Sequence, residues 1–129
     1  MSISFDSALG VHPYALDVRA DRARILAGNL ANVDTPGYLV RDVDYKSILG
    51  RVAQQVAAKE EGSAIATGNL QQAMQQPLYR IPYQVSMDGN TAELSVEQSK
   101  FANNATDFQT SLTFLNMKIT GIAKAIEGR

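Results

Sequence analysis

Apolar residues recur at steps of four and then three positions at the N-terminal end of the chain. The stepping runs from Phe5 to Leu30, and it is the pattern of an α-helix with one narrow buried seam. A proline is tolerated in a first helical turn and not later, so Pro13 predicts a regular helix that begins near His12 or Pro13. Residues 1–11 then form a less regular lead-in. The predicted packing positions are Leu9, Leu16, Ala23, Leu26 and Leu30.

The same stepping returns near the C-terminus, here without a polar interruption. It predicts a helix from about Thr91 to Glu127, roughly 50 Å long at 1.5 Å per residue. The flanking positions are mostly polar, so the apolar stripe on this helix is narrow. Its packing positions are Phe101, Ala105, Phe108, Leu112, Leu115, Ile119, Ile122 and Ile126.

The two seams differ in length, and this difference bears on what the chain contacts. A helix in water is held mainly by packing of its apolar face, to which each buried Leu, Ile or Phe contributes roughly 1.5–3 kcal/mol. A first helix that starts at Pro13 covers only part of the C-terminal seam. We therefore expect part of that seam to contact another molecule; a two-helix core within one monomer is the alternative.

Two polar side chains, His12 and Arg19, stand on the first seam where apolar residues are expected. Either the helix turns a different face towards its partner, or these residues meet polar groups on a neighbour. Both explanations are open at the level of sequence.

Between about Tyr45 and Met87 the periodicity fades. The sequence SILGRVAQQVAAKEEG predicts a short helix that Gly62 closes, and the Gln-rich residues 63–77 are typical of a mobile segment. The sequence LYRIPYQVS predicts an edge strand or extended segment, because Pro82 cannot donate to a sheet. MDGNT then predicts a turn in which Asp88-Gly89 accepts positive φ.

These elements predict a mainly α fold with one domain. Residues 1–44 and 78–129 are expected to form a discontinuous core, in which the N- and C-terminal helices make an antiparallel coiled coil beside an extended edge segment. Residues 45–77 are expected to form a variable, partly mobile arm that is irregular and partly β.

Composition narrows the function by exclusion. The chain has 129 residues and a formal net charge of −1, so it carries no electrostatic footprint for nucleic acid. It has no apolar run long enough to span a membrane, and Asp6 interrupts the N-terminal segment where a cleaved signal peptide would be apolar. Cysteine is absent, which excludes disulfides and thiolate chemistry.

The residues that usually carry catalysis are scattered. His12 is the only histidine, the glycines form no phosphate loop, and Glu60-Glu61 lies in a polar run. The sequence therefore predicts no catalytic residue, no metal site, no cofactor and no small-molecule ligand, and an enzyme is not expected.

The stretch ANVDTPGY is different, because its residues specify a rigid stop to the first helix. Asn32 can close that helix in a left-handed conformation. Thr35 precedes a proline and is pushed out of helical geometry. Pro36 and Gly37 fit the central positions of a type II turn, after which Tyr38 can anchor the chain.

This stretch resembles the N-terminal signature of the bacterial flagellar rod, hook and hook-associated proteins. In that family an N-terminal helix is followed by Ala-Asn, a short variable gap, and Thr-Pro-Gly-Tyr or a close variant. The matching positions here are Asn29, Ala31, Asn32, Thr35, Pro36, Gly37 and Tyr38. Within the family, the short length and the C-terminal segment with its DGNT turn and FANN step resemble a small protein of the proximal rod.

The resemblance implies a structural subunit of the flagellar basal body, part of the drive shaft and of the export channel wall, that assembles with copies of itself through its terminal helices. It also implies contacts with other rod proteins, with membrane-ring and adaptor proteins at the rod base, and with the flagellar type III export apparatus. Export without a cleaved signal peptide to the periplasmic rod would follow. A soluble coiled-coil adaptor or export chaperone-like binding protein is the alternative hypothesis.

Overall fold

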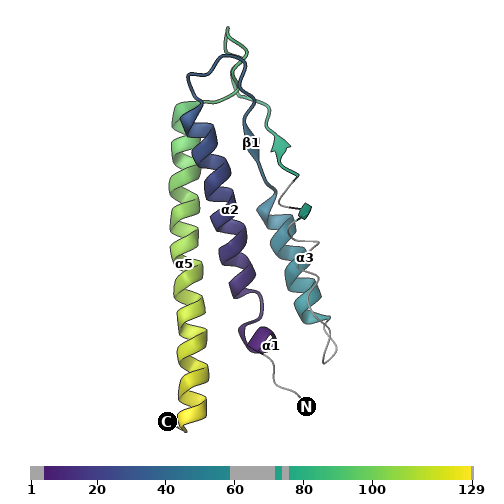
Figure 1. The fold of residues 1–129 in the computed structure, drawn as a ribbon, viewed down its shortest axis with the longest axis vertical. Helices are drawn as coiled ribbons and strands as arrows, with labels where there is room; N and C mark the ends of the chain where they lie inside the picture. Colours follow the sequence, from purple (N-terminus) through teal and green to yellow (C-terminus); the bar gives the residue numbers. More distant parts are fainter. Residues whose placement is uncertain (1–4, 59–71, 74–75, 129) are drawn as a thin grey trace.

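A computed structural model describes residues 5–58, 72–73 and 76–128 of the chain. Its helices and strands are α1 (Phe5–Leu9), α2 (His12–Ala31), β1 (Arg41–Asp42), α3 (Tyr45–Ala57), β2 (Leu78–Tyr79) and α5 (Leu94–Glu127). Figure 1 shows an elongated molecule in which α2 lies between α5 and α3, and α2 and α5 run in opposite directions. The predicted fold class, mainly α with antiparallel terminal helices and a small β element between them, is confirmed.

The first long helix begins where the sequence predicts. Pro13 stands in the first turn of α2, where its missing N–H breaks no helical hydrogen bond. The lead-in contains one short helix, α1, and Gly10 between the two helices has a positive φ of 62°.

The last helix begins at Leu94, three residues later than predicted, and tertiary contacts explain the difference. The Thr91 N–H donates to the carbonyl of Tyr38, and the Thr91 hydroxyl accepts from the N–H of Val40. These bonds hold the chain before α5 against the segment after α2, and Glu93 is still extended at φ −111° and ψ 113°. At the other end Gly128 caps α5 in the left-handed conformation.

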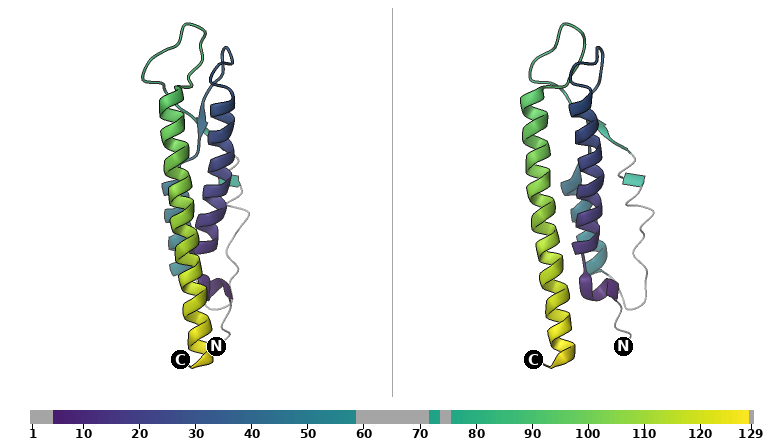
Figure 2. Two further views of the ribbon diagram at one scale, coloured as in Figure 1. Left: turned by 90° about the vertical axis from the view of Figure 1, so that its left-hand side faces the viewer. Right: turned by 60° about the vertical axis from the view of Figure 1, so that its left-hand side comes forward.

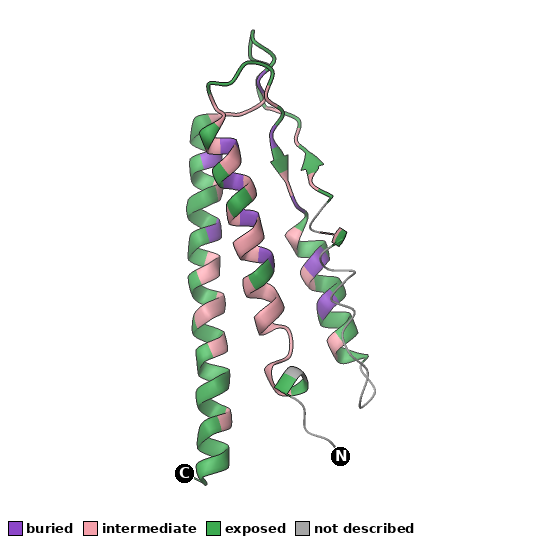
Figure 3. Cartoon of the chain, viewed as in Figure 1, coloured by how far each residue is buried: buried purple, intermediate pink, exposed green. Residues whose placement is uncertain are grey.

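The most deeply buried face of α2 is rotated away from the predicted seam. Its buried residues are Val18, Arg22, Leu26 and Asn29, of which only Leu26 was on the predicted row. The other predicted positions on α1 and α2, namely Leu9, Leu16, Ala23 and Leu30, are half-buried. The rotation has a physical cause: α2 packs against α5 on one side and against β1 and α3 on the other, so one apolar row cannot describe its contacts (Figure 3).

On α5 the row that faces α2 changes along the helix. Near its start the buried residues are polar, Glu97 and Asn104, while Phe101 and Ala105 of the predicted row are exposed. Further on, the predicted positions Phe108, Leu112, Leu115 and Ile122 are half-buried, whereas Ile119 and Ile126 are exposed. A straight α-helix drifts by about 20° per heptad relative to a seven-residue repeat, which accounts for the change of row.

The core lies between α2 and α3. Val18 of α2 packs with Val43, Ile48 and Val52, and the last two belong to α3. The sequence placed this helix in a variable arm, whereas in the structure it completes the core.

The bounds of α3 differ from the predicted ones. Asp44 caps its first turn by accepting from the Ser47 N–H at 3.2 Å and from the Ser47 hydroxyl at 2.6 Å. The prediction that this helix extends to Gly62 is wrong, since α3 ends at Ala57. Gly62 itself and most of the Gln-rich residues 63–77 lie outside the described residues.

A two-stranded antiparallel sheet completes the fold. Arg41 pairs with Tyr79, and Asp42 pairs with Leu78. The extended conformation predicted for LYRIPYQVS is confirmed over these residues, and Pro82 follows the strand without interrupting it. None of the described helices is both long and apolar enough to cross a membrane.

Candidate functional site

The first of two turns at the end of the molecule follows α2 (Figure 2). The Tyr38 N–H donates to the carbonyl of Thr35 at 3.3 Å, and Gly37 has a φ of 70°. The positive φ predicted for Gly37 is confirmed, and a side chain at this position would be strained by the backbone alone. The Thr35 hydroxyl donates to the side-chain oxygen of Asn32 at 3.0 Å and ties the turn to the end of α2.

Asn32 closes α2 as predicted, but by a different geometry. Its φ is −113°, so the expectation of a left-handed cap is wrong. Its side-chain amide instead donates to the carbonyl of Gly28 at 2.8 Å, which satisfies one of the carbonyls left free in the last helical turn.

The second turn precedes α5 and is built from MDGNT. The Gly89 N–H donates to the carbonyl of Ser86 at 3.1 Å, and Gly89 has a φ of 77°, as the Asp-Gly pair predicted. The carboxylate of Asp88 accepts from the Ser86 hydroxyl at 2.6 Å and from the Asn90 N–H at 3.0 Å. Together these bonds make a compact turn with its own internal support.

The two turns are locked together by the side chain of Asn90, which is only 3% exposed. Its amide donates to three main-chain carbonyl oxygens at the start of the first turn: those of Asn32 at 3.0 Å, Val33 at 2.8 Å and Thr35 at 2.9 Å. Its side-chain oxygen accepts from the N–H of Ala92 at 2.7 Å. One side chain thus satisfies main-chain groups of both connections.

The two glycines of these turns lie close together. The Gly37 N–H donates to the carbonyl of Asp88 at 3.0 Å, and a Cβ on Gly89 would stand 3.8 Å from the Gly37 Cα. We call this arrangement, residues 32–38 with 86–91, the turn pair.

Asn29, the upstream residue of the motif, lies directly below the turn pair and is fully buried. Its side-chain oxygen accepts from the Tyr38 hydroxyl and from the Arg41 N–H, both at 3.2 Å. Its amide donates to the carbonyl of Arg41 at 2.7 Å and to the carboxylate of Glu97 at 3.0 Å. The motif asparagine therefore joins α2, β1 and α5.

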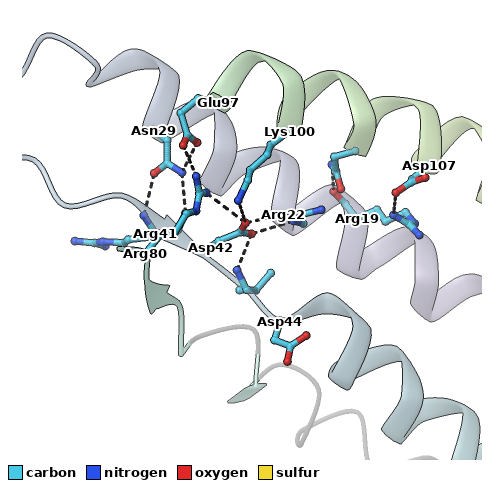
Figure 4. A network of polar contacts seen from close by, with 12 residues as sticks. Arg19, Arg22, Asn29, Arg41, Asp42, Asp44, Arg80, Glu97, Lys100 and Asp107 are labelled. Carbon is cyan, nitrogen blue, oxygen red and sulfur yellow. Dashed lines mark hydrogen bonds and ion pairs between the residues drawn. The ribbon is translucent and has the colours of Figure 1, made fainter. Parts of the chain in front are cut away.

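A network of charges continues from this asparagine (Figure 4). Glu97 is 0% exposed and pairs with Arg80, which also reaches Asp42 at 3.3 Å. Asp42 in turn accepts two bonds from the guanidinium of Arg22, at 2.9 and 3.1 Å, and lies 3.6 Å from the ammonium of Lys100. These ionisable side chains come from α2, β1, α5 and the segment after β2, and they hold the upper half of the molecule together.

The electrostatics favour the charged forms of Asp42 and Arg22. Burial of Asp42 opposes its charge, but hydrogen bonds and the positive charge of Arg22 outweigh that effect and lower the pKa of Asp42. The pKa of Arg22 is raised, because the bonds to Asp42 exceed the cost of its burial. The guanidinium of Arg22 also lies 4.3 Å from the ring centroid of Tyr45, at cation–π distance.

Lower on the helix pair, Arg19 resolves a question that the sequence left open. Its guanidinium pairs with Asp107 of α5 at 2.7 Å, and its carbonyl accepts from the side-chain amide of Asn104 at 2.9 Å. His12 contacts the ring of Phe114, with centroids 6.3 Å apart. The α2 face is rotated, and both polar residues of the predicted seam also find partners within the same chain.

The structure gathers some predicted site residues and leaves others on the surface. Asn29 is buried, Asn32 and Tyr38 are half-buried, and Ala31, Thr35, Pro36 and Gly37 are exposed at the end of the molecule. Sequence reasoning found both turns but missed their contact. It also missed the charge network, since no local spacing marks Asp42, Arg80 and Glu97 as partners.

The arrangement positions backbone segments and offers no reactive centre. Across residues 5–58, 72–73 and 76–128, no three His, Asp or Glu side chains are grouped in a way that could hold a metal ion. The carboxylates that the structure brings together are held by arginine and asparagine side chains. These side-chain contacts hold the backbone segments of α2, β1 and α5 in fixed positions relative to one another.

Comparison with known proteins gives relatives that cover almost the whole chain. The chain is 42% identical over 135 residues to the flagellar basal body rod protein FlgB of Aeromonas hydrophila, covering 99% of this chain and 98% of the relative. It is 39% identical to the protein of the same name from Salmonella typhimurium and 38% identical to that of Escherichia coli, over 95% of this chain and 95% and 94% of those relatives. No family model matches the chain.

Proposed function

The chain belongs to the FlgB family of flagellar basal body rod proteins, and from that premise we propose how it joins its neighbours. It is a structural subunit of the bacterial flagellar rod and not an enzyme, as the ANVDTPGY signature predicted. Family membership also removes the basis for the alternative hypothesis of a soluble adaptor or export chaperone.

We propose that copies of this chain assemble through the part of α5 that extends beyond α2. The observation that carries the proposal is a mismatch of length: α5 has 34 residues and α2 has 20, or roughly 50 Å against 30 Å. Below α2 the helix keeps its apolar row of Leu115, Ile119, Ile122 and Ile126. We call these four residues the C-terminal row.

The C-terminal row is only partly covered within the chain. Leu115 and Ile122 are half-buried, but Ile119 is 49% and Ile126 81% exposed. An apolar row of this kind on a protein that forms part of a rod is expected to be buried by a neighbouring subunit. Assembly would then complete the packing that α5 lacks in the monomer.

The family resemblance also implies where the subunit lies and which other proteins it contacts, and we include both in the proposal. The subunit would lie in the proximal rod, where a tubular array of terminal helices forms part of the drive shaft and of the wall of the export channel. It would contact other rod proteins along the axis, membrane-ring and adaptor proteins at the rod base, and the type III export apparatus during export without a cleaved signal. The turn pair would hold the ends of α2 and α5 in the orientation that this packing needs.

An in-frame deletion in the native host tests the proposal. Electron microscopy should show cells without flagella, and complementation with the wild-type gene should restore both flagella and swimming. Basal bodies isolated from the complemented strain should contain the chain. Normal flagella on the deletion strain would overturn the proposal.

A further inference from the structure

A second apolar surface lies at the other end of the molecule, on residues 79–87. The apolar residues there stand at every second position and are largely exposed, including Ile81 at 90%, Tyr83 at 88% and Val85 at 85%, and the intervening Gln84 and Ser86 are exposed as well. The alternating set is Tyr79, Ile81, Tyr83, Val85 and Met87, and we call it the edge patch.

This segment is tied to the rest of the molecule at two points. The Arg80 side chain pairs with buried Glu97, and the main-chain N–H of Gln84 donates to the carboxylate of Glu93 at 3.0 Å, while the Gln84 side chain itself is exposed. Its apolar side chains are left in solvent. A segment that is attached at two points and still leaves these apolar side chains exposed marks an interaction surface.

The size of the edge patch suits a specific contact. Side chains of this kind and number present on the order of 700 Å² of largely apolar surface, close to the roughly 800 Å² that each partner buries in a standard protein interface. Tyr79 and Tyr83 add rigid rings whose hydroxyls can remain hydrated at a rim.

We propose that the edge patch of one copy binds the C-terminal row of the next copy. This inference rests on the assembly proposed above and names the surface that covers the row. The two surfaces differ in kind, one a non-helical segment and the other a helix face, and they lie towards opposite ends of the long axis (Figure 1). A contact between two different surfaces is heterologous and places copies head to tail, so it extends into an open array instead of closing a dimer.

Charge favours the same pairing. At one end of the edge patch the turn pair carries the exposed carboxylates of Asp34 and Asp88, and one cation, Arg41, lies 5.8 Å from the ring centroid of Tyr79 at the other end. Lys118 and Lys124 flank the C-terminal row beside one acid, Glu127. Opposite charges at the rims of two apolar surfaces favour binding of one surface to the other. Like charges disfavour binding of either surface to a second copy of itself.

Because the chain has no cysteine, engineered cysteine pairs test the contact directly. We would express double variants from the complemented strain, isolate basal bodies, oxidise them and separate the products under non-reducing conditions. One cysteine would replace Ile81, Tyr83 or Val85, and the other would replace Ile119 or Ile126. At least one pair should give a ladder of multiples of the 14.0 kDa chain.

The controls separate this inference from the proposed function. A pair that joins Ile126→Cys to Gln54→Cys, an exposed site on α3, should give no ladder, and single variants should stay monomeric. Basal bodies that contain the variants without any ladder would overturn the inference and leave the rod function standing. Dimers from a single edge-patch cysteine, or products containing only a different rod protein, would also overturn it. Absence of the wild-type chain from basal bodies would overturn both proposals.

A substitution gives an independent readout. The variant with Ile81, Tyr83 and Val85 all changed to Ser removes apolar groups that are exposed in the monomer, so its thermal unfolding should match that of the wild type. The number of flagella per cell should fall at least tenfold. The neighbouring variant Gln84→Ser changes an exposed polar side chain and should assemble normally; equal flagellation of the two variants would contradict the inference.

Discussion

The side-chain amide of Asn90 donates to the main-chain carbonyl of Thr35 at 2.9 Å, across 55 positions of sequence. This bond connects the turn after the first long helix to the turn before the last one. Both turns were recognisable in the sequence as short motifs, and the contact explains why they occur together: each supplies main-chain groups that the other satisfies.

Replacing Asn90 should therefore loosen both turns at once. Asn90→Ala removes the donor to three carbonyls in a site that is 3% exposed, and leaving a buried polar group unsatisfied costs about 1–3 kcal/mol. We expect the free energy of unfolding to fall by at least that amount in urea titrations followed by circular dichroism. Asn116→Ala, at an exposed site on α5, is the matched control. Equal stability of the two variants would show that the turns do not depend on this side chain.

Gly37→Val tests whether the first turn depends on the positive φ of Gly37. The φ of 70° is strained for a β-branched residue even though the space around the position is open, so the variant should lose roughly 1–3 kcal/mol of stability. We expect it to be exported and to assemble poorly. Gly50→Ala, in α3, also points into open space but has no positive φ, and it should be neutral or slightly stabilising. Wild-type numbers of rods from Gly37→Val would mean that the turn is incidental to assembly.

Glu97→Ala should be among the most damaging single substitutions. It removes a fully buried carboxylate and leaves Arg80 and Asn29 without their partner, and breaking a buried pair in this way costs about 3–5 kcal/mol. Asp17→Ala, on the exposed face of α2, gives a comparison for loss of an acid. Thermal unfolding of the purified chain measures both, and similar melting temperatures would contradict the structural role of Glu97.

The ion pair of Asp42 and Arg22 predicts a dependence on pH with a definite sign. The folded pKa of Asp42 lies below its ordinary value of 3.8, so the contribution of the carboxylate is complete above that pH and is lost as the pH falls through the lowered value. The stability difference between the wild type and Asp42→Asn should be constant near neutrality and shrink below about pH 4. A difference that stays the same from neutral pH down through the whole acid range would refute this account of the network.

Local chemistry explains what could be predicted from the sequence. Pro13 fixes the start of α2, and the Pro36-Gly37 and Asp88-Gly89 pairs fix two turns, because each is a constraint on backbone conformation within a few residues. These features do not depend on the rest of the fold.

The arrangement around Leu26 shows why the buried faces could not be predicted as well. Heptad stepping selects one apolar row, but α2 has neighbours on two sides, and its most buried row includes Arg22 and Asn29. A polar residue in such a row is satisfied only by groups distant in sequence: Asn29 meets Glu97 across 68 positions. Periodicity in one helix carries no information about those partners.

The most direct test of the account concerns Ile119, because it is exposed in the monomer and yet belongs to the row on which assembly is proposed to depend. We would complement the deletion strain with Ile119→Asp and with its exposed neighbour Thr120→Asp, and quantify the chain in purified basal bodies. The account predicts normal unfolding of both proteins, wild-type amounts of Thr120→Asp in the rod, and an absence of Ile119→Asp, since the charge would be buried without a partner. Wild-type amounts of Ile119→Asp in basal bodies would contradict it.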